Sequence, residues 1–447
     1  LDGRRYGVER FFQDVKSHTR FGTAYISLKR LIDGECTISP LYRIRTFFRE
    51  AVMPGDLQSS RILYELRTLA NIYSAELKAN YRLLRRKFDE GESGKVIQKA
   101  EGLLRDIERF LANLRELHAL FMEPSVDEKL RTALRWSDEY ISLTTDKILF
   151  YLYNFLKHEK VCKHIEKIMR SEAEYRKSMD YQGVLYSGKS SEAERVIYRE
   201  SILKKWSQTV LYMSTEETGT NQKIGHILAS VAAAAAMSFA VAATFFAERL
   251  FASYSIPWAM IIVVSYILKD RIKEILRGVL VRLMPRLIAD RTEKLTDHAV
   301  GRAVGKTKSM VRFIHPSETP RNIRVLRNSS TNPFRSILPR ENVIHFRKDI
   351  FLESRKLMKE HTRLEAVTEI IRIKLDRFMI EMDDARKYLR TWGDDKPQAV
   401  KGKRVYHVNL ILALTDEVLM EEKLFRYRLI MSSQGIERIE EDAGPGE

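Results

Sequence analysis

Two uncharged apolar runs lie next to each other near the middle of the chain. The first covers 224–247 and the second covers 250–268, and only Glu248 and Arg249 separate them. A helix needs about 20 apolar residues to cross the roughly 30 Å hydrocarbon core of a bilayer. The pattern therefore predicts a transmembrane helical hairpin over 223–268, whose two spans cross in opposite directions and leave both flanking regions on one side.

The region before the hairpin carries apolar residues at the three- and four-residue spacing of amphipathic helices. Breaks in the pattern fall at 91–94, at 123–125 and at 183–191. Short connections between such helices are typical of a bundle, so we expect 1–215 to form a mainly helical domain. Its expected core consists of three stripes: Ile62, Leu66, Leu69, Ile72, Leu77 and Tyr81; Ile97, Leu104, Ile107, Leu111, Leu114 and Leu117; Leu130, Leu134, Ile141, Leu149 and Leu152.

The region after the hairpin begins with basic residues interleaved with apolar ones. This pattern predicts a basic amphipathic juxtamembrane helix within 269–310, with a break near Pro285. The segment 311–341 is rich in Pro, Ser, Thr and Asn, and we expect it to be a linker.

The C-terminal region shows both helical and strand-like periodicity. The expected elements are a strand at 342–346, a helix over 351–392, and strands in RVYHVNLILAL and KLFRYRLIMSS. We therefore predict a small α+β domain with an antiparallel sheet over 342–440, followed by an acidic tail over 441–447. The predicted fold class is a mainly α membrane protein that combines the bundle, the hairpin, the juxtamembrane helix and this domain.

Composition adds constraints on partners and compartment. The formal net charge is +17, which favours anionic partners. Only Cys36 and Cys162 are present, which argues against a disulfide framework and suits a reducing compartment. The first residues lack an apolar core, so we expect no cleavable signal peptide and expect the hairpin to direct membrane insertion.

The distribution of basic residues around the hairpin predicts its orientation. Lys and Arg are frequent on both outer flanks, whereas the connection carries only Arg249. The positive-inside rule then places both soluble domains in the cytoplasm, and we expect a bacterial inner membrane. Tyr254 and Trp258 are expected at the outer interface. Ser230, Ala234, Ser238 and Ala242 form a small-residue face that packs against the second span or against another subunit in a homo-oligomer.

The basic residues after the second span predict contact with the bilayer and its anionic headgroups. The lipid-contacting candidates are Lys269, Arg271, Lys273, Arg277 and Arg282. Nucleic acid is the less expected partner, because the chain has no zinc-finger motif and no aromatic RNP-like motif. We also expect an unknown cytoplasmic protein partner.

One segment matches the phosphate-loop pattern GxxxxGK[ST], with Gly183, Gly188, Lys189 and Ser190 at its fixed positions. In a true phosphate loop these residues hold a nucleotide, and the loop follows a buried strand. The residues before Gly183 are polar, so we interpret the match as a loop between helices, with nucleotide binding as the alternative.

No other pattern indicates catalysis or a cofactor. His158, Cys162 and Glu166 can share one helix face, but a zinc site needs a fourth ligand or a water, and no partner pair is evident. We predict a non-enzymatic scaffold, sensor or regulator without cofactor or metal. The alternatives are a membrane-bound nucleotide-binding enzyme and an oligomerising membrane-disrupting effector.

Overall fold

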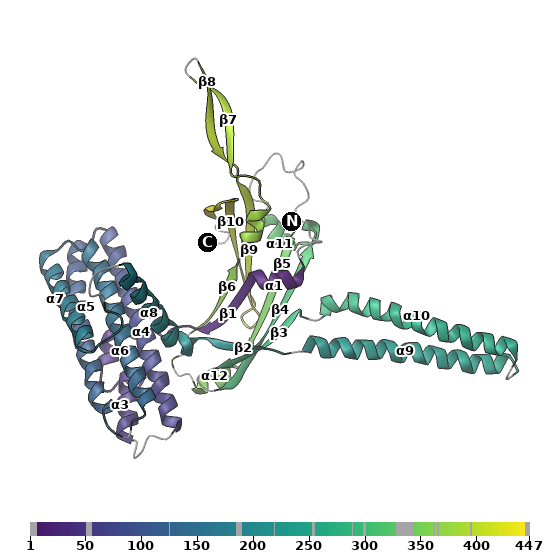
Figure 1. The fold of residues 1–447 in the computed structure, drawn as a ribbon, viewed down its shortest axis with the longest axis horizontal. Helices are drawn as coiled ribbons and strands as arrows, with labels where there is room; N and C mark the ends of the chain where they lie inside the picture. Colours follow the sequence, from purple (N-terminus) through teal and green to yellow (C-terminus); the bar gives the residue numbers. More distant parts are fainter. Residues whose placement is uncertain are drawn as a thin grey trace.

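The N-terminal half of the chain forms a helical bundle, as its periodicity predicts (Figure 1). Asp127 begins one of the long helices by accepting a hydrogen bond from the Lys129 amide at 3.0 Å. Gly91 occupies the turn between two others with φ of +85°, a conformation that glycine adopts without steric cost. The helices are α2 (Leu28–Ile32), α3 (Pro40–Glu50), α4 (Asp56–Asp89), α5 (Ser93–Phe121), α6 (Glu128–Phe155), α7 (Glu159–Ser178) and α8 (Ser190–Gln208).

The predicted stripes form a large part of the core of the bundle. Leu66, Leu69 and Ile107 are fully buried, and the Tyr73 ring stacks on Phe110 with 4.4 Å between centroids. Burial of apolar side chains at helical spacing is what holds such a bundle together. The bundle is therefore confirmed, and every stripe residue is buried except Tyr81 and Ile97, which are partly buried.

The structure is a computed structural model, and its description covers most of the chain. The described residues are 7–50, 56–124, 126–184, 190–218, 220–252, 255–287, 289–297, 301–327, 343–360, 363, 366–393 and 396–442.

Beside the bundle lies a body of antiparallel sheets that takes strands from both ends of the chain (Figure 1). β1 (Val15–Phe21) pairs with β6 (Val367–Ile373). A four-stranded sheet has the order β2 (Met213–Glu217), β3 (Arg291–Asp297), β4 (Arg302–Ile314) and β5 (Val343–Leu352). A second sheet has the order β11 (Gly435–Asp442), β10 (Glu421–Ser432) and β9 (Tyr406–Asp416).

Two further features project from this body in Figure 1. One is a long arm made of α9 (Thr220–Leu250) and α10 (Ile256–Leu287), and the other is a two-stranded ribbon made of β7 (Arg386–Gly393) and β8 (Lys396–Lys403). Short helices lie around the sheets: α1 (Val8–Asp14), α11 (Arg321–Arg327), α12 (Ser354–Glu360), α13 (Asp376–Ile380) and the 3-10 turn η2 (Pro316–Glu318). A second 3-10 turn, η1 (Thr209–Leu211), follows α8 and contacts the bundle helices α4 and α8.

The prediction for 269–310 is wrong in its second half. The helix that leaves the arm ends at Leu287, two residues after Pro285, and the chain then forms β3 and β4. Burial alternates along the middle of β4, where Thr307, Ser309 and Val311 are buried and the residues between them are not. This period of two is that of a half-buried strand, which the high lysine content obscured.

The linker and helix predictions further along also need correction. The predicted linker 311–341 begins inside β4 and contains α11, while 328–342 lies outside the described residues. The predicted helix over 351–392 is instead divided among α12, β6, α13 and β7. β-branched residues such as Val367, Ile370 and Ile371 favour a strand where a partner is available, and β1 provides that partner.

The predicted domain division changes for the same reason. The segment 342–440 does not form its sheets alone, because β5 pairs with β4 and β6 pairs with β1. Residues 7–21, which contain α1 and β1, likewise belong with the sheets and not with the bundle. The antiparallel C-terminal strands are confirmed, with β9 paired to β10. β11 extends to Asp442, into the predicted tail.

Candidate functional site: an apolar helical arm

The arm is inserted between two neighbouring strands of one sheet. β2 leads into α9, and α10 leads back into β3, which pairs with β2 from Met213↔Asp297 to Glu217↔Glu293. Thr218 extends this pairing, because its amide and its hydroxyl both donate to the Thr292 carbonyl at 2.9 Å. The arm therefore takes the place of a hairpin turn, and its base is held by the sheet.

The two arm helices pack through a stripe of alanines. Ala232, Ala236 and Ala247 on α9 are fully buried, and α10 is the element that runs alongside (Figure 1). On the α10 side, Ser265 is buried. Side chains this small allow two helix backbones to approach closely.

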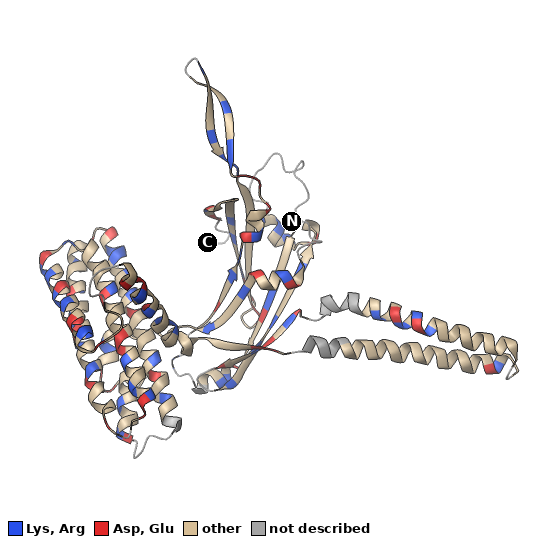
Figure 2. Ribbon diagram, viewed as in Figure 1, with Lys and Arg blue, Asp and Glu red and all other residues tan. Residues whose placement is uncertain are grey.

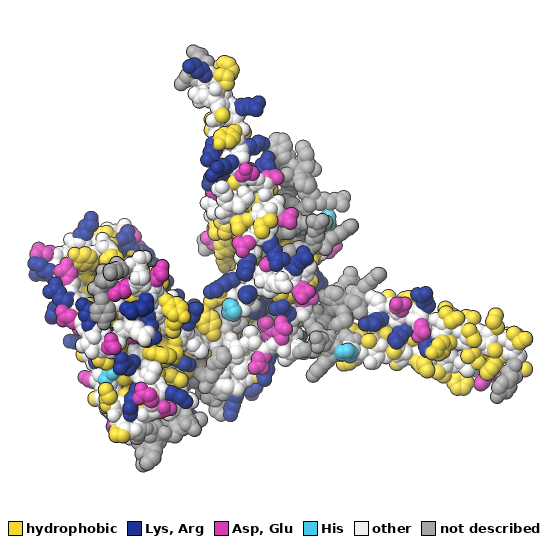
Figure 3. All heavy atoms as spheres, in the orientation of Figure 1, with side chains coloured by type: hydrophobic (Ala, Val, Ile, Leu, Met, Phe, Trp, Pro, Cys, Tyr) yellow, Lys and Arg dark blue, Asp and Glu magenta, His cyan; other side chains and the backbone are white. Residues whose placement is uncertain are grey.

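Most large side chains of the distal arm are exposed. Figure 3 shows a nearly continuous apolar surface toward the tip of the arm. On α9 the exposed residues are Ile227, Val231, Met237, Phe239, Val241, Phe245, Phe246 and Leu250, and on α10 they are Ile256, Met260, Val263, Val264, Tyr266, Ile267 and Leu268. A surface of this extent indicates an apolar partner, because soluble monomers rarely expose such patches to water.

The two helices differ in apolar length. α9 is long and apolar enough to span a membrane over His226–Leu250, which is 25 residues or about 37 Å. α10 begins only at Ile256 and meets its first charge at Lys269, so its uncharged part is about 13 residues or about 20 Å. One described helix thus meets the criteria for a span, and the predicted pair of spans is not confirmed.

The part of α10 that carries charged side chains lies beside a part of α9 that has none (Figure 2). Lys269 places its Nζ 3.7 Å from the centroid of the Tyr266 ring, and Arg271 lies 3.7 Å from Glu274. Lys273 and Arg277 are exposed. Asp270 and Glu274 offset part of the positive charge, so this face is less basic than the lysines and arginines alone predict.

Two other predicted membrane residues fall outside what can be described. Tyr254 is not among the described residues, and nothing is stated of the Arg282 side chain. Trp258 lies in the first turn of α10, where its amide donates to Ser255 Oγ at 3.4 Å.

The predicted small-residue face does not pack against α10. Ser230, Ala234, Ser238 and Ala242 are all exposed, and both serine hydroxyls donate to a carbonyl one turn earlier in α9. The arm helices instead contact each other through the alanine stripe, which lies on a different face of α9. The Ser/Ala face is therefore an open surface of the arm.

The phosphate-loop match lies between two helices. α7 precedes Gly183 where a phosphate loop requires a strand, and Gly188 and Lys189 lie outside the described residues. The Gly183 amide, which would face a phosphate, donates to Glu139 Oε1 at 2.8 Å. A Cβ at Gly183 would lie 2.9 Å from Leu143 Cδ1. Ser190 begins α8. Gly183 therefore packs closely against α6, where a larger residue would have to displace the Leu143 side chain.

Sequence reasoning missed a network of buried charges inside the bundle. Asp138 is fully buried, and its Oδ2 accepts from Tyr175 at 2.6 Å and from Tyr181 at 2.7 Å, with His118 Nε2 at 3.1 Å. Burial raises the pKa of Asp138, but the hydrogen bonds from His118 and the two tyrosines outweigh it and lower that pKa below the ordinary value. The polar run SDEYISLTTD at 137–146, in the middle of a helix, was the available signal.

The network extends through paired groups. Glu172 accepts from Arg115 at 2.6 Å and from Ser142 at 2.7 Å, and Glu139 accepts from Arg199 at 2.6 Å. Burial and the nearby Asp138 carboxylate raise the pKa values of Tyr175 and Tyr181. Because these carboxylates are bound to internal donors, the network is suited to fixing the register of the helices and not to holding a ligand.

The described residues contain no group of three or more His, Cys, Asp or Glu placed to hold a metal ion. His158 is the residue before α7, and Cys162 Sγ contacts the Leu156 carbonyl at 3.5 Å.

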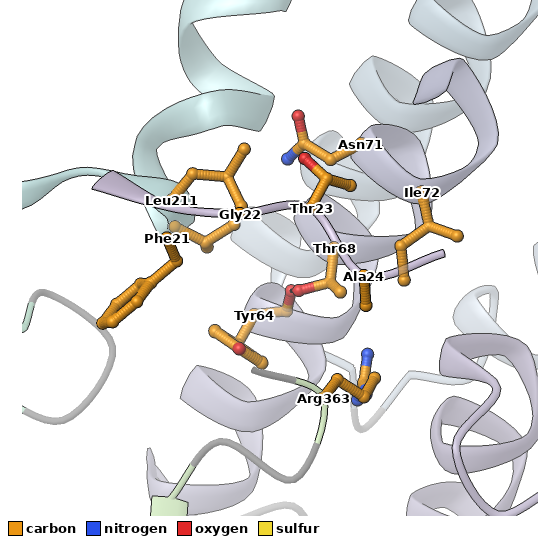
Figure 4. A pocket seen from close by; sticks show the side chains of 11 residues that line it. Phe21, Gly22, Thr23, Ala24, Tyr64, Thr68, Asn71, Ile72, Leu211 and Arg363 are labelled. Carbon is orange, nitrogen blue, oxygen red and sulfur yellow. Dashed lines mark hydrogen bonds between the residues drawn. The ribbon is translucent and has the colours of Figure 1, made fainter. Parts of the chain in front are cut away.

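A small recess lies where the bundle meets the sheets (Figure 4). It has room of about 40 Å³, which suits water-sized molecules. Tyr64, Thr68 and Asn71 line it from α4, and Arg363 lines it from the segment before β6. The Arg363 guanidinium binds both carboxylate oxygens of the buried Glu65, which Arg43 also contacts at 3.3 Å. The recess therefore marks the contact between the bundle and the sheets, which is called the joint below and contains the Arg363–Glu65 ion pair.

Comparison of the chain with protein-family models, with curated proteins and with solved structures finds no match.

Proposed function

We propose that this protein is a non-enzymatic scaffold, sensor or regulator, anchored in a bacterial inner membrane by the α9–α10 arm with the bundle and the sheets in the cytoplasm. The observation that carries the proposal is the exposed apolar surface of the distal arm. Burying it in hydrocarbon removes that surface from water, at about 25 cal/mol per Å².

The difference in apolar length between the helices suggests how the arm sits in the bilayer. Lys269 and Arg271 lie about 20 Å from the start of α10, so they reach the inner headgroups only if the bilayer thins or their side chains extend toward the interface. In this arrangement the outer part of the arm crosses the membrane, and the charged part of α10 lies at the cytoplasmic surface.

A second surface supports a role in contacting another protein. Leu410, Leu412 and Leu414 alternate along β9, and the register places Phe425 opposite Leu412 on the same face. All four side chains are exposed, and so is Ile439 on β11. An exposed apolar sheet face on the cytoplasmic body is a reasonable site for a protein partner.

Extraction of membranes tests the anchoring. The full chain should remain with membranes after alkaline carbonate and leave them only with detergent. Phe245→Asp on the exposed surface of α9 should weaken this retention, because a carboxylate in hydrocarbon costs about 2.5–3.5 kcal/mol. The matched control is Met358→Asp, which changes an equally exposed side chain on α12. Release of the wild-type chain by carbonate alone would rule out the anchor.

An oligomerising membrane-disrupting effector is a second candidate, favoured by the open Ser230, Ala234, Ser238 and Ala242 face. Close helix contact through that face would be blocked by larger residues. Vesicle leakage that wild type causes and Ala234→Leu abolishes would support this candidate. Vesicles that stay intact with wild type would exclude it.

A further inference from the structure

The β7–β8 ribbon carries no core of its own. Every side chain of β7 from Arg386 to Trp392 is exposed, with Tyr388 at 65% and Trp392 at 75% exposure. An isolated two-stranded ribbon is marginally stable in water and gains little from aromatic residues left in solvent. Core packing therefore does not account for these aromatics.

The strand register separates the ribbon into two different faces. Side chains of directly paired residues lie on the same face, and alternate residues lie on opposite faces. One face, here called the aromatic face, contains Arg386, Tyr388, Arg390, Trp392, Lys401 and Lys403. The other face contains Lys387, Leu389, Thr391, Lys396, Gln398 and Val400.

Among the described residues, most basic side chains of the aromatic face have no carboxylate partner. The described residues of both strands include no Asp or Glu (Figure 2). Lys403 pairs with Glu437 at 2.6 Å, but no described ion pair joins Arg386, Arg390 or Lys401 to a carboxylate. Asp383, at the base of the ribbon, is engaged by Arg404 and Tyr406.

The chemistry of the aromatic face matches an unpaired polynucleotide. Guanidinium and ammonium groups neutralise phosphates, and exposed rings stack on bases of any sequence. Tyr388 and Trp392 are four residues apart, about 13 Å along the strand, with Arg390 between them. An acidic peptide would use the charges but leave the two rings without a role.

The direction of the ribbon argues against a lipid surface. Figure 1 shows that the ribbon and the α9–α10 arm leave the sheets in different directions. A bilayer that surrounds the distal arm does not reach the ribbon, so the ribbon is free for a soluble polyanion.

We propose that the aromatic face of the β7–β8 ribbon binds single-stranded nucleic acid. The backbone lies along Arg386, Arg390 and Lys401, and bases stack on Tyr388 and Trp392. The proposal goes beyond the membrane scaffold and stands if the anchor fails. It also reverses the expectation from sequence that nucleic acid is an unlikely partner. A helix was predicted for most of β7, and a helix does not place these side chains on one face.

The test is fluorescence anisotropy with full-length protein in detergent and a labelled oligothymidylate of about 20 nucleotides, beside a duplex of equal length. Trp392→Ala should weaken binding about tenfold, and Trp392→Phe should retain most of it. Arg390→Glu with Lys401→Glu should weaken binding further. The logarithm of affinity should fall with the logarithm of salt with a slope of about −2, as three phosphate contacts predict.

The matched control is Lys387→Glu with Lys396→Glu, which makes the same charge change on the opposite face. This control should retain clearly more binding than the aromatic-face charge variant, and the duplex should bind more weakly than the single strand. The proposal is overturned if wild type does not bind, if the two charge variants lose binding equally, or if Trp392→Ala binds as wild type. Binding to phosphatidylserine vesicles that is weaker for the aromatic-face charge variant than for wild type, with no binding of the oligonucleotide by wild type, would assign the face to lipid instead.

Discussion

Single carboxylates in the bundle core each accept hydrogen bonds from several side chains. One oxygen of Asp138 receives bonds from three side chains on three segments, and Glu172 links α7 to Arg115 on α5 and Ser142 on α6. Such bonds have directions, whereas leucine contacts tolerate sliding. The buried charges therefore specify which helix faces meet.

Asp138→Asn should lower the stability of the bundle by about 2–3 kcal/mol at neutral pH, because it removes charge-assisted hydrogen bonds from a buried site. The folded-state pKa of Asp138 is lowered, so its contribution is complete above the ordinary pKa of about 4 and is lost as the pH falls through the folded value. Urea unfolding at several pH values, followed by circular dichroism, measures both effects.

The variant should therefore be less sensitive to acid than wild type. The matched control is Asp89→Asn at an exposed ion pair with Arg85, which should change stability by less than about 1 kcal/mol. Equal stability of Asp138→Asn and wild type at neutral pH would show that the network does not hold the bundle.

At the scale of elements, the periodicity of the sequence predicted the helices and strands that form through contacts between residues close together in the chain. The bundle helices, the long arm helices and the β9–β10 strands follow from spacing within each segment. β1 and β6 do not, because they pair residues such as Thr19 and Glu369 that are 350 positions apart. The ribbon was missed for a related reason, since β7 has no buried face to give it a strand-like pattern.

One part of the candidate site could likewise be predicted from sequence and another part could not. The apolar arm could be predicted from its length and lack of charge. The alanine stripe that joins its helices could not, because two small-residue faces lie on α9 and only packing distinguishes Ala236 from Ala234.

These two alanines give a matched pair of substitutions. Ala236→Leu should destabilise the arm by about 1–3 kcal/mol, because α10 leaves no room for the larger side chain. Ala234→Leu is exposed and should leave the arm intact. The thermal unfolding of detergent-solubilised protein measures the difference, and a larger loss for Ala234→Leu would contradict the assigned packing face.

At the scale of the whole molecule, the bundle, the sheets and the arm meet through few connections. β1 enters the bundle from the sheets, β2 returns from it and continues into the arm, and Arg20 and Tyr212 form a bridge between these two paths. The Arg363–Glu65 ion pair adds a contact across the joint. The bundle is therefore connected to the base of the arm through β2.

Arg363→Ala should loosen this joint, because it removes one of two cations from the buried Glu65 while Arg43 remains. We expect faster amide exchange in 22–27 and in β6, and a loss of about 1–3 kcal/mol in stability. Hydrogen-exchange mass spectrometry measures the local effect. The exposed arginine substitution Arg86→Ala serves as the control, and equal exchange in both variants would argue against a joint.

The central claim is that the arm crosses a membrane with the bundle and the sheets on one side. It is tested most directly by placing one cysteine at Ser255, between the arm helices, in a chain with Cys36→Ser and Cys162→Ser. A membrane-impermeant maleimide added to intact cells or spheroplasts should label Ser255→Cys, and it should label Ser354→Cys, at the start of α12 beside the sheets, only after lysis. Labelling of Ser354→Cys from outside, or protection of Ser255→Cys until the membrane is dissolved, would contradict the account.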